Sequence, residues 1–84
     1  MQIFYSSTFE KRYRKLPQFV KDIAEEKERV FRSDSFNTSL KTHKLHGKLN
    51  QYYSFSLNNK YRIIFSFDDK NDVRFHSIGT HDIY

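Results

Sequence analysis

The alternation of large apolar residues with small or polar ones between positions 53 and 67 constrains the fold more than any other feature of the sequence. The large side chains recur at every second position on both sides of residues 58 and 59: Tyr53, Phe55 and Leu57, then Tyr61, Ile63, Phe65 and Phe67. A period of two is typical of strands that bury one face. Asn58 and Asn59 predict a two-residue hairpin turn, because asparagine tolerates a positive φ. The segment therefore predicts an antiparallel hairpin with one aromatic and one polar face.

Two helices are predicted before this hairpin. Residues 7–10 fit a capping box in which Ser7 is the N-cap and Glu10 the residue three positions on. The apolar residues of this first helix share one face: Phe9, Tyr13 and Leu16. Pro17 breaks it and suits the first turn of a second helix at residues 18–32, whose apolar stripe is interrupted at Lys27. That stripe consists of Phe19, Val20, Ile23, Val30 and Phe31.

The remaining segments complete an α+β fold. Residues 2–5 predict a short strand, residues 33–39 a loop, and residues 68–72 a turn before a last strand at 73–78, whereas residues 40–50 fit no element clearly. The order is an N-terminal strand, a helical hairpin and a three-strand antiparallel meander, with both helices on one sheet face. Five aromatic residues are assigned to the core: Phe4, Phe55, Phe65, Phe67 and Phe75. The opposite face would carry Ser54, Ser56 and Arg62 and be open to a ligand.

Length and composition limit the class of protein. The 84 residues suffice for one domain, 1–84, with one modest core. An aromatic content of 18% argues against a disordered chain. The absence of cysteine excludes disulfides and thiolate metal sites. No segment approaches the roughly 20 apolar residues of a membrane helix, and the N-terminus has no long apolar run, so a cytoplasmic protein without a membrane partner is expected.

Positive charge is concentrated in the middle of the chain. The formal net charge is +5, and residues 35–67 contain neither Asp nor Glu. That stretch contains seven basic residues or histidines: Lys41, His43, Lys44, His46, Lys48, Lys60 and Arg62. A solvated lysine-rich surface is one interpretation. The tyrosines interleaved with these cations favour the other, a nucleic-acid partner.

Three motifs in this order resemble the RelE/ParE superfamily of toxins. They are the basic segment Leu45-His46-Gly47, the strand Tyr61-Arg62-Ile63-Ile64-Phe65, and the ending Gly79-Thr80-His81 followed by the aromatic Tyr84. The pattern is most similar to the YafQ-like branch. That branch has a further His and an Asp between these motifs, and the corresponding residues 55–60 of this sequence contain neither.

The resemblance implies a toxin of a type II toxin-antitoxin system that cleaves mRNA on the ribosome without metal or cofactor. A base takes the proton of a ribose 2′-OH, a cation stabilises the phosphorane, and an acid protonates the leaving oxygen. The resemblance assigns proton transfer to His81 and to His43 or His46, and it assigns phosphate binding to Arg62. Tyr84 would stack on a base or hold the substrate. Lys41, Lys44, Lys48 and Lys60 would position RNA, and an antitoxin would be the protein partner.

Each assignment has an alternative. His81 can be a surface histidine, and Arg62 can belong to a cross-strand ion pair. A zinc site at His43 and His46 with His76, His81 and Asp82 lacks a recognised ligand spacing. Because the additional His and Asp of the YafQ-like branch are missing, the chain can also be a non-catalytic toxin or binding module, such as a ParE-like gyrase inhibitor or an inactive homologue.

Overall fold

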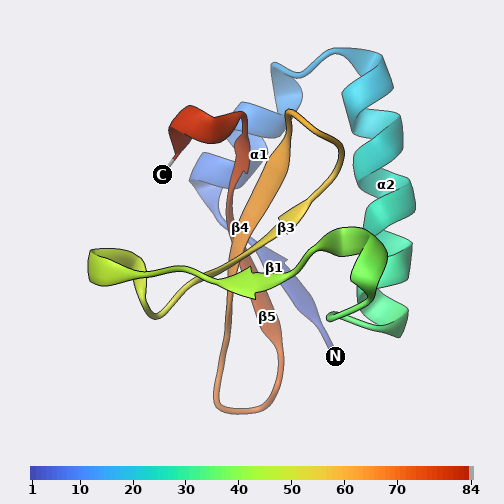
Figure 1. Ribbon diagram of the computed structural model, residues 1–84. Helices are drawn as coiled ribbons and strands as arrows, with labels where there is room; N and C mark the ends of the chain where they lie inside the picture. The colour runs from blue at the N-terminus through green and yellow to red at the C-terminus, as the bar shows by residue number, and fades with distance from the viewer. Residues whose placement is uncertain (84) are drawn as a thin grey trace.

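A computed structural model describes residues 1–83, which form two α-helices, a sheet and three single-turn 3-10 helices (Figure 1). The helices are α1 (Ser7–Arg14) and α2 (Gln18–Ser33). The strands are β1 (Ile3–Tyr5), β2 (His43–Lys44), β3 (Tyr53–Ser56), β4 (Arg62–Phe67) and β5 (Val73–Gly79). The short turns are η1 (Thr38–Leu40), η2 (Gly47–Leu49) and η3 (His81–Ile83).

The sheet has the order β1-β5-β4-β3-β2. β1 runs parallel to β5, and every other pair is antiparallel. This architecture confirms the predicted α+β class, with its N-terminal strand, helical hairpin and meander. The additional strand β2 lies in the segment to which the sequence assigned no element. Two residues are too few to show an alternation in the sequence. β2 is defined by its backbone pairing with β3.

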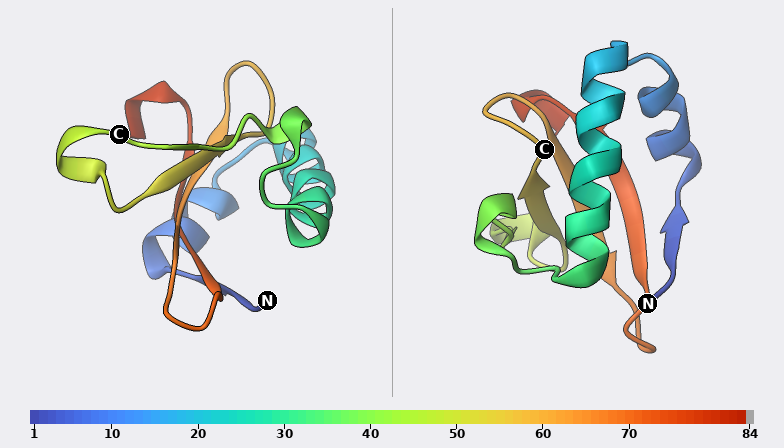
Figure 2. Two further views of the ribbon diagram at one scale, coloured as in Figure 1. Left: turned by 60° about the horizontal axis from the view of Figure 1, so that its bottom comes forward. Right: turned by 90° about the vertical axis from the view of Figure 1, so that its right-hand side faces the viewer.

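Both helices pack on the same sheet face, as predicted (Figure 2). Phe31 of α2 is fully buried, and its ring centroid lies 4.8 Å from that of Phe55, 4.9 Å from Phe65 and 5.6 Å from Phe75. Phe9 of α1 joins them with its ring centroid 5.5 Å from that of Phe75. The core is therefore a cluster of stacked and edge-on phenylalanines, one from each helix and from each of the three meander strands.

Two aromatic residues assigned to buried positions are exposed, and both assignments are wrong. Phe19 is 60% exposed, because the buried side of α2 is centred on Val20, Ala24 and Phe31, and Phe19 lies about 100° around the helix from Val20. Phe4 is 42% exposed, since it lies on the sheet face away from the helices. The spacing of apolar residues along a helix or strand does not show how wide its buried face is.

Local hydrogen bonding corrects two further predictions. The N-cap of α1 is Ser6 and not Ser7. The Ser6 hydroxyl accepts from the Phe9 amide at 3.0 Å and donates to the His76 carbonyl at 2.9 Å, so one side chain caps the helix and binds it to β5. At the β3–β4 turn neither asparagine has a positive φ. Instead Asn58 Oδ1 accepts from the amides of Lys60 and Tyr61, which closes a longer turn.

Candidate functional site

The sheet face opposite the helices carries the polar side chains. Residues opposite each other in register share a face, so Ser56, Arg62 and Gly79 form one row across β3, β4 and β5. Ser54, Ile64 and Ser77 form the next row. The expectation that this face carries Arg62 and Ser56 is confirmed.

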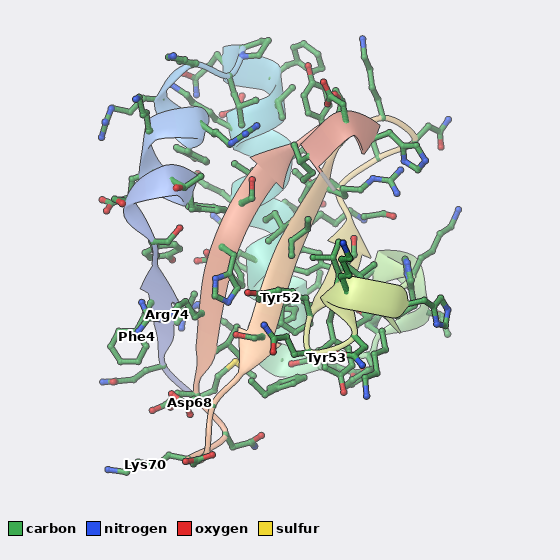
Figure 3. All side chains as sticks on the ribbon, turned by 90° about the vertical axis from the view of Figure 1, so that its left-hand side faces the viewer. Phe4, Tyr52, Tyr53, Asp68, Lys70 and Arg74 are labelled. Carbon is green, nitrogen blue, oxygen red and sulfur yellow. The ribbon has the colours of Figure 1, made fainter. Side chains whose placement is uncertain are left out.

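The middle of this face is less open than predicted. Ser54 also lies on this face, but it is only 1% exposed and Ile64 is 6% exposed, so the expectation that the face is open to a ligand is wrong at these two residues. The physical reason is that larger neighbours lie over the small central residues. Tyr52 precedes β3, yet its ring centroid is 4.9 Å from that of His76 on β5, so the ring crosses β4 (Figure 3).

Arg62 and His81 come from the same end of the sheet. Arg62 is the first residue of β4 and pairs in register with Gly79. His81 follows Gly79 by two residues, begins η3 and is exposed. A Cβ at position 79 would lie 2.5 Å from Ile83 Cγ2, so the glycine allows η3 to fold against the end of β5. The Gly-Thr-His motif thus places His81 at the same end of the sheet as Arg62.

The turn that holds His81 also holds a carboxylate. Thr80 Oγ1 donates to Asp82 Oδ1, and this hydrogen bond is the largest cause of a lowered pKa for the Asp82 carboxyl. The positive charges of Arg12 and His81 lower that pKa further. Asp82 is therefore ionised at neutral pH and places a negative charge beside His81.

His43, but not His46, lies on the sheet face that carries Arg62. His43 is in β2 and pairs with Ser54, whereas His46 lies beyond β2 at the N-cap of η2. The Nδ1 of His43 is 3.0 Å from the Lys41 carbonyl oxygen. A carbonyl only accepts hydrogen bonds, so Nδ1 carries the proton in a neutral ring and Nε2 is left as an acceptor. The two strand spacings between β2 and β4 amount to roughly 10 Å.

The four lysines assigned to RNA are all exposed but do not share one face. Lys41 precedes β2, Lys48 lies in η2, and Lys60 lies in the β3–β4 turn. Lys44 follows His43 in β2 and pairs with Tyr53, so it projects from the helix side of the sheet edge. The positive charge therefore borders the β2–β3 side of the sheet. Tyr84, the remaining candidate, lies outside the described residues.

A cluster on the polar face includes His76, which the sequence assigned only to a zinc alternative. His76 Nε2 and Ser66 Oγ are 2.7 Å apart, and burial, with a smaller contribution from Arg74, lowers the pKa of His76 below its ordinary value. A bulge creates this arrangement, because Ile64 pairs with Ser77 and Phe65 with Phe75, which leaves His76 as the extra residue of β5. No sequence signal marks the bulge, so sequence reasoning missed the cluster.

Nowhere in residues 1–83 do three or more His, Asp or Glu side chains gather as they would around a metal ion. Neither helix of this part of the chain is long and apolar enough to cross a membrane.

Comparisons with known proteins agree with this geometry. The family profile described as "RelE-like toxin of type II toxin-antitoxin system HigB" matches residues 2–77, so the chain belongs to the HigB-like family of RelE-like toxins. It is therefore a toxin of a type II toxin-antitoxin system, and the resemblance to the RelE/ParE superfamily is confirmed. No curated protein matches the chain by sequence.

Solved structures of similar toxins share the fold. YafQ from E. coli strain BL21(DE3) superimposes with a TM-score of 0.80 at 18% identity, covering 96% of this chain and 93% of YafQ. The YoeB dimer from Staphylococcus aureus gives a TM-score of 0.71 at 26% identity, covering 96% and 97% of the two chains. A YoeB–YefM complex from the same organism gives 0.73 at 25% identity, with the same coverage.

Proposed function

We propose that this toxin is a metal-independent endoribonuclease that cleaves mRNA on the ribosome. The observation that carries the proposal is the placement of Arg62 and His81 at one end of the polar face, with His43 on that same face. Cleavage by a ribose 2′-OH needs three catalytic functions: charge stabilisation, a general base and a general acid. A guanidinium and two imidazoles can provide them.

We assign these catalytic roles to individual residues from the local geometry. His43 is the general base, because its Nδ1 is held by the Lys41 carbonyl and its Nε2 can accept the 2′-OH proton. Arg62 binds the phosphate, since a guanidinium can hold two oxygens at once. His81 is the general acid that protonates the leaving 5′ oxygen, and the ionised Asp82 carboxylate lies beside it. His46 and Tyr84 are secondary candidates.

The exposed lysines around this face would position the RNA. Lys41, Lys48 and Lys60 border the β2–β3 side of the polar face, and phosphate contacts of this kind fix register without reading sequence. An mRNA held by the ribosome is the substrate, and the toxin acts where translation occurs, in the cytoplasm.

Purified toxin added to a reconstituted translation reaction tests the proposal. Mapping the 5′ ends of one defined mRNA should reveal new ends inside the translated frame, and a zinc-selective chelator should leave them unchanged. Cleavage that stops with the chelator and returns with zinc would overturn the metal-independent mechanism. Intact mRNA, with inhibition of DNA gyrase instead, would assign the toxin to a non-cleaving mode of action.

The protein partner we propose is an antitoxin that docks an acidic segment on the basic stretch between Lys41 and Arg62. Solved structures of related toxins in complexes, DinJ-YafQ and YoeB-YefM, support this choice of partner. Such a segment would compete with RNA for the same cations, or displace the residues around His81. The alternative site is the helical side, where a groove of about 350 Å³ between α1 and α2 is lined by Tyr13, Glu25 and Glu28 among others.

A further inference from the structure

The geometry points to a nucleotide-binding subsite on the polar face, formed by Tyr52, His76 and Arg74, which holds the RNA strand beside the proposed cleavage site. This inference rests on the proposed function, since RNA is the ligand in both. It adds residues that the cleavage chemistry does not use.

The three residues are contiguous on one face of the sheet. Arg74 and His76 are two positions apart on β5, so their side chains project to the same side. Tyr52 reaches His76 with ring centroids 4.9 Å apart and planes at 73°. Figure 3 shows Tyr52 in front of the sheet, and Arg74 beside Phe4 at its β1 edge, on the side opposite α2.

Their chemistry suits a nucleotide. Tyr52 is half-exposed and offers a ring for base stacking, which tolerates any base. His76 is held neutral by burial and is tied to Ser66, so its ring presents a fixed hydrogen-bonding edge rather than a charge. Arg74 is exposed, with its guanidinium carbon 5.9 Å from the centroid of the Phe4 ring. A stacking ring, a neutral polar edge and a cation match a base and its phosphate.

The distance to Arg62 suits a nucleotide about two positions along the strand. On β4, Arg62 and Ser66 are four residues apart, which is roughly 13 Å at the rise of a β-strand. Ser66 pairs with Arg74 and is hydrogen-bonded to His76.

Three variants test the subsite in the translation reaction described above. Tyr52→Leu keeps an apolar side chain but removes the π face, so the cleavage rate should fall about tenfold, whereas Tyr52→Phe should cleave like the parent. Arg74→Ala should lower the rate about tenfold at all sites, because it removes a charge-assisted phosphate contact. His76→Gln should change which bases flank the cuts, a readout that a purely structural role would not move.

Controls separate the subsite from general effects. Arg29→Ala removes the same charge from an exposed position on α2, behind the sheet, and should cleave like the parent. Urea denaturation of every variant reports whether the fold is retained. Parent-like rates and unchanged flanking bases in Tyr52→Leu, Arg74→Ala and His76→Gln would overturn the subsite while leaving the proposed nuclease intact.

A second measurement distinguishes the subsite from the nuclease itself. A fluorescent 2′-O-methyl RNA oligonucleotide lacks the attacking hydroxyl, so its anisotropy reports binding without cleavage. Weaker binding by Tyr52→Leu and Arg74→Ala than by the parent and Arg29→Ala supports the subsite even if mRNA stays intact. Equal binding by all four proteins overturns it, as does the absence of any binding by a parent that also leaves mRNA intact.

Discussion

The two faces of the sheet differ in residue type and in burial. The face under the helices carries Phe55, Phe65 and Phe75, each at most 1% exposed and in ring contact with Phe31. The other face carries half-buried polar residues such as Arg62 and His76, and His76 is hydrogen-bonded to Ser66. The strands thus hold a close-packed core on one side and leave the other side free to carry chemistry.

The energetics of the two faces differ accordingly. Burial of one phenylalanine side chain contributes about 2–3 kcal/mol. A hydrogen bond such as the one between Ser66 and His76 contributes about 1 kcal/mol. Substitutions on the helix side should therefore act on stability, and substitutions on the polar side on activity. The following predictions test that division.

The largest effect is expected for Phe31→Ala. Phe31 is fully buried among three other rings, so its loss should cost about 3–5 kcal/mol of unfolding free energy and abolish activity together with the fold. The matched control is Phe19→Ala on the same helix, where the ring is 60% exposed and the change should stay within about 0.5 kcal/mol. Urea denaturation measures both, and equal losses would contradict the division between core and surface.

His81→Ala should abolish toxicity and keep the fold. The side chain is exposed on η3, so its removal opens no cavity, whereas loss of a general acid costs about 10²–10⁴ in rate. Growth arrest after induction and cleavage of a defined mRNA measure the activity, and urea denaturation checks the fold. A variant as active as the parent would remove His81 from the mechanism.

Arg62→Ala should be almost as damaging as His81→Ala, and Arg62→Lys should recover only part of the activity. Lysine keeps the charge but cannot make the planar two-point contact with a phosphate. The cleavage rate of each variant, set beside its unfolding free energy, is the measurement. Parent-like activity of Arg62→Lys would reduce Arg62 to a general positive charge, and loss of activity through unfolding would favour a structural ion pair.

A smaller effect is expected where charge alone acts. Lys44→Glu and Lys48→Glu should slow association with the antitoxin several-fold at low salt, because charge steers the encounter, and added salt should slow the parent in the same direction. Dissociation should change less, since buried apolar contacts set it. Association rates across a salt series are the measurement. If neither salt nor charge reversal alters them, the antitoxin docks on the helical side.

The smallest expected effect is on the pH dependence of the unfolding free energy, through His76 on the polar face. Burial lowers the pKa of His76 from its ordinary value of 6.5, so the unfolded chain binds the proton more readily than the folded one. The contribution of neutral His76 to the free energy of unfolding is therefore fully present above that value and is lost as the pH falls below it. His76→Gln, which does not titrate, should show a flatter dependence of unfolding free energy on pH. Identical profiles would mean that the His76 environment is not desolvated.

The sequence was most informative where a pattern repeats within one element. The period-two alternation after residue 53 predicted β3 and β4, and Pro17 predicted the boundary between α1 and α2. The motifs that resemble RelE-like toxins pointed to Arg62 and His81, which the fold brings to one end of the sheet. Assignments that depended on only one or two residues fared worse: Ser7 as the N-cap and Asn58-Asn59 as a tight turn were both wrong.

The sequence by itself determined the class of fold, the aromatic core and the concentration of positive charge, because periodicity, volume and charge are properties of neighbouring residues. The tertiary structure decided which aromatic rings are exposed, that Ser54 is covered, and that His76 meets Tyr52 and Ser66 across three strands. These outcomes depend on strand register and on one bulge in β5, which are set by contacts between residues far apart in the chain. No local pattern encodes them, since shifting the register by one residue turns every side chain of a strand to the other face.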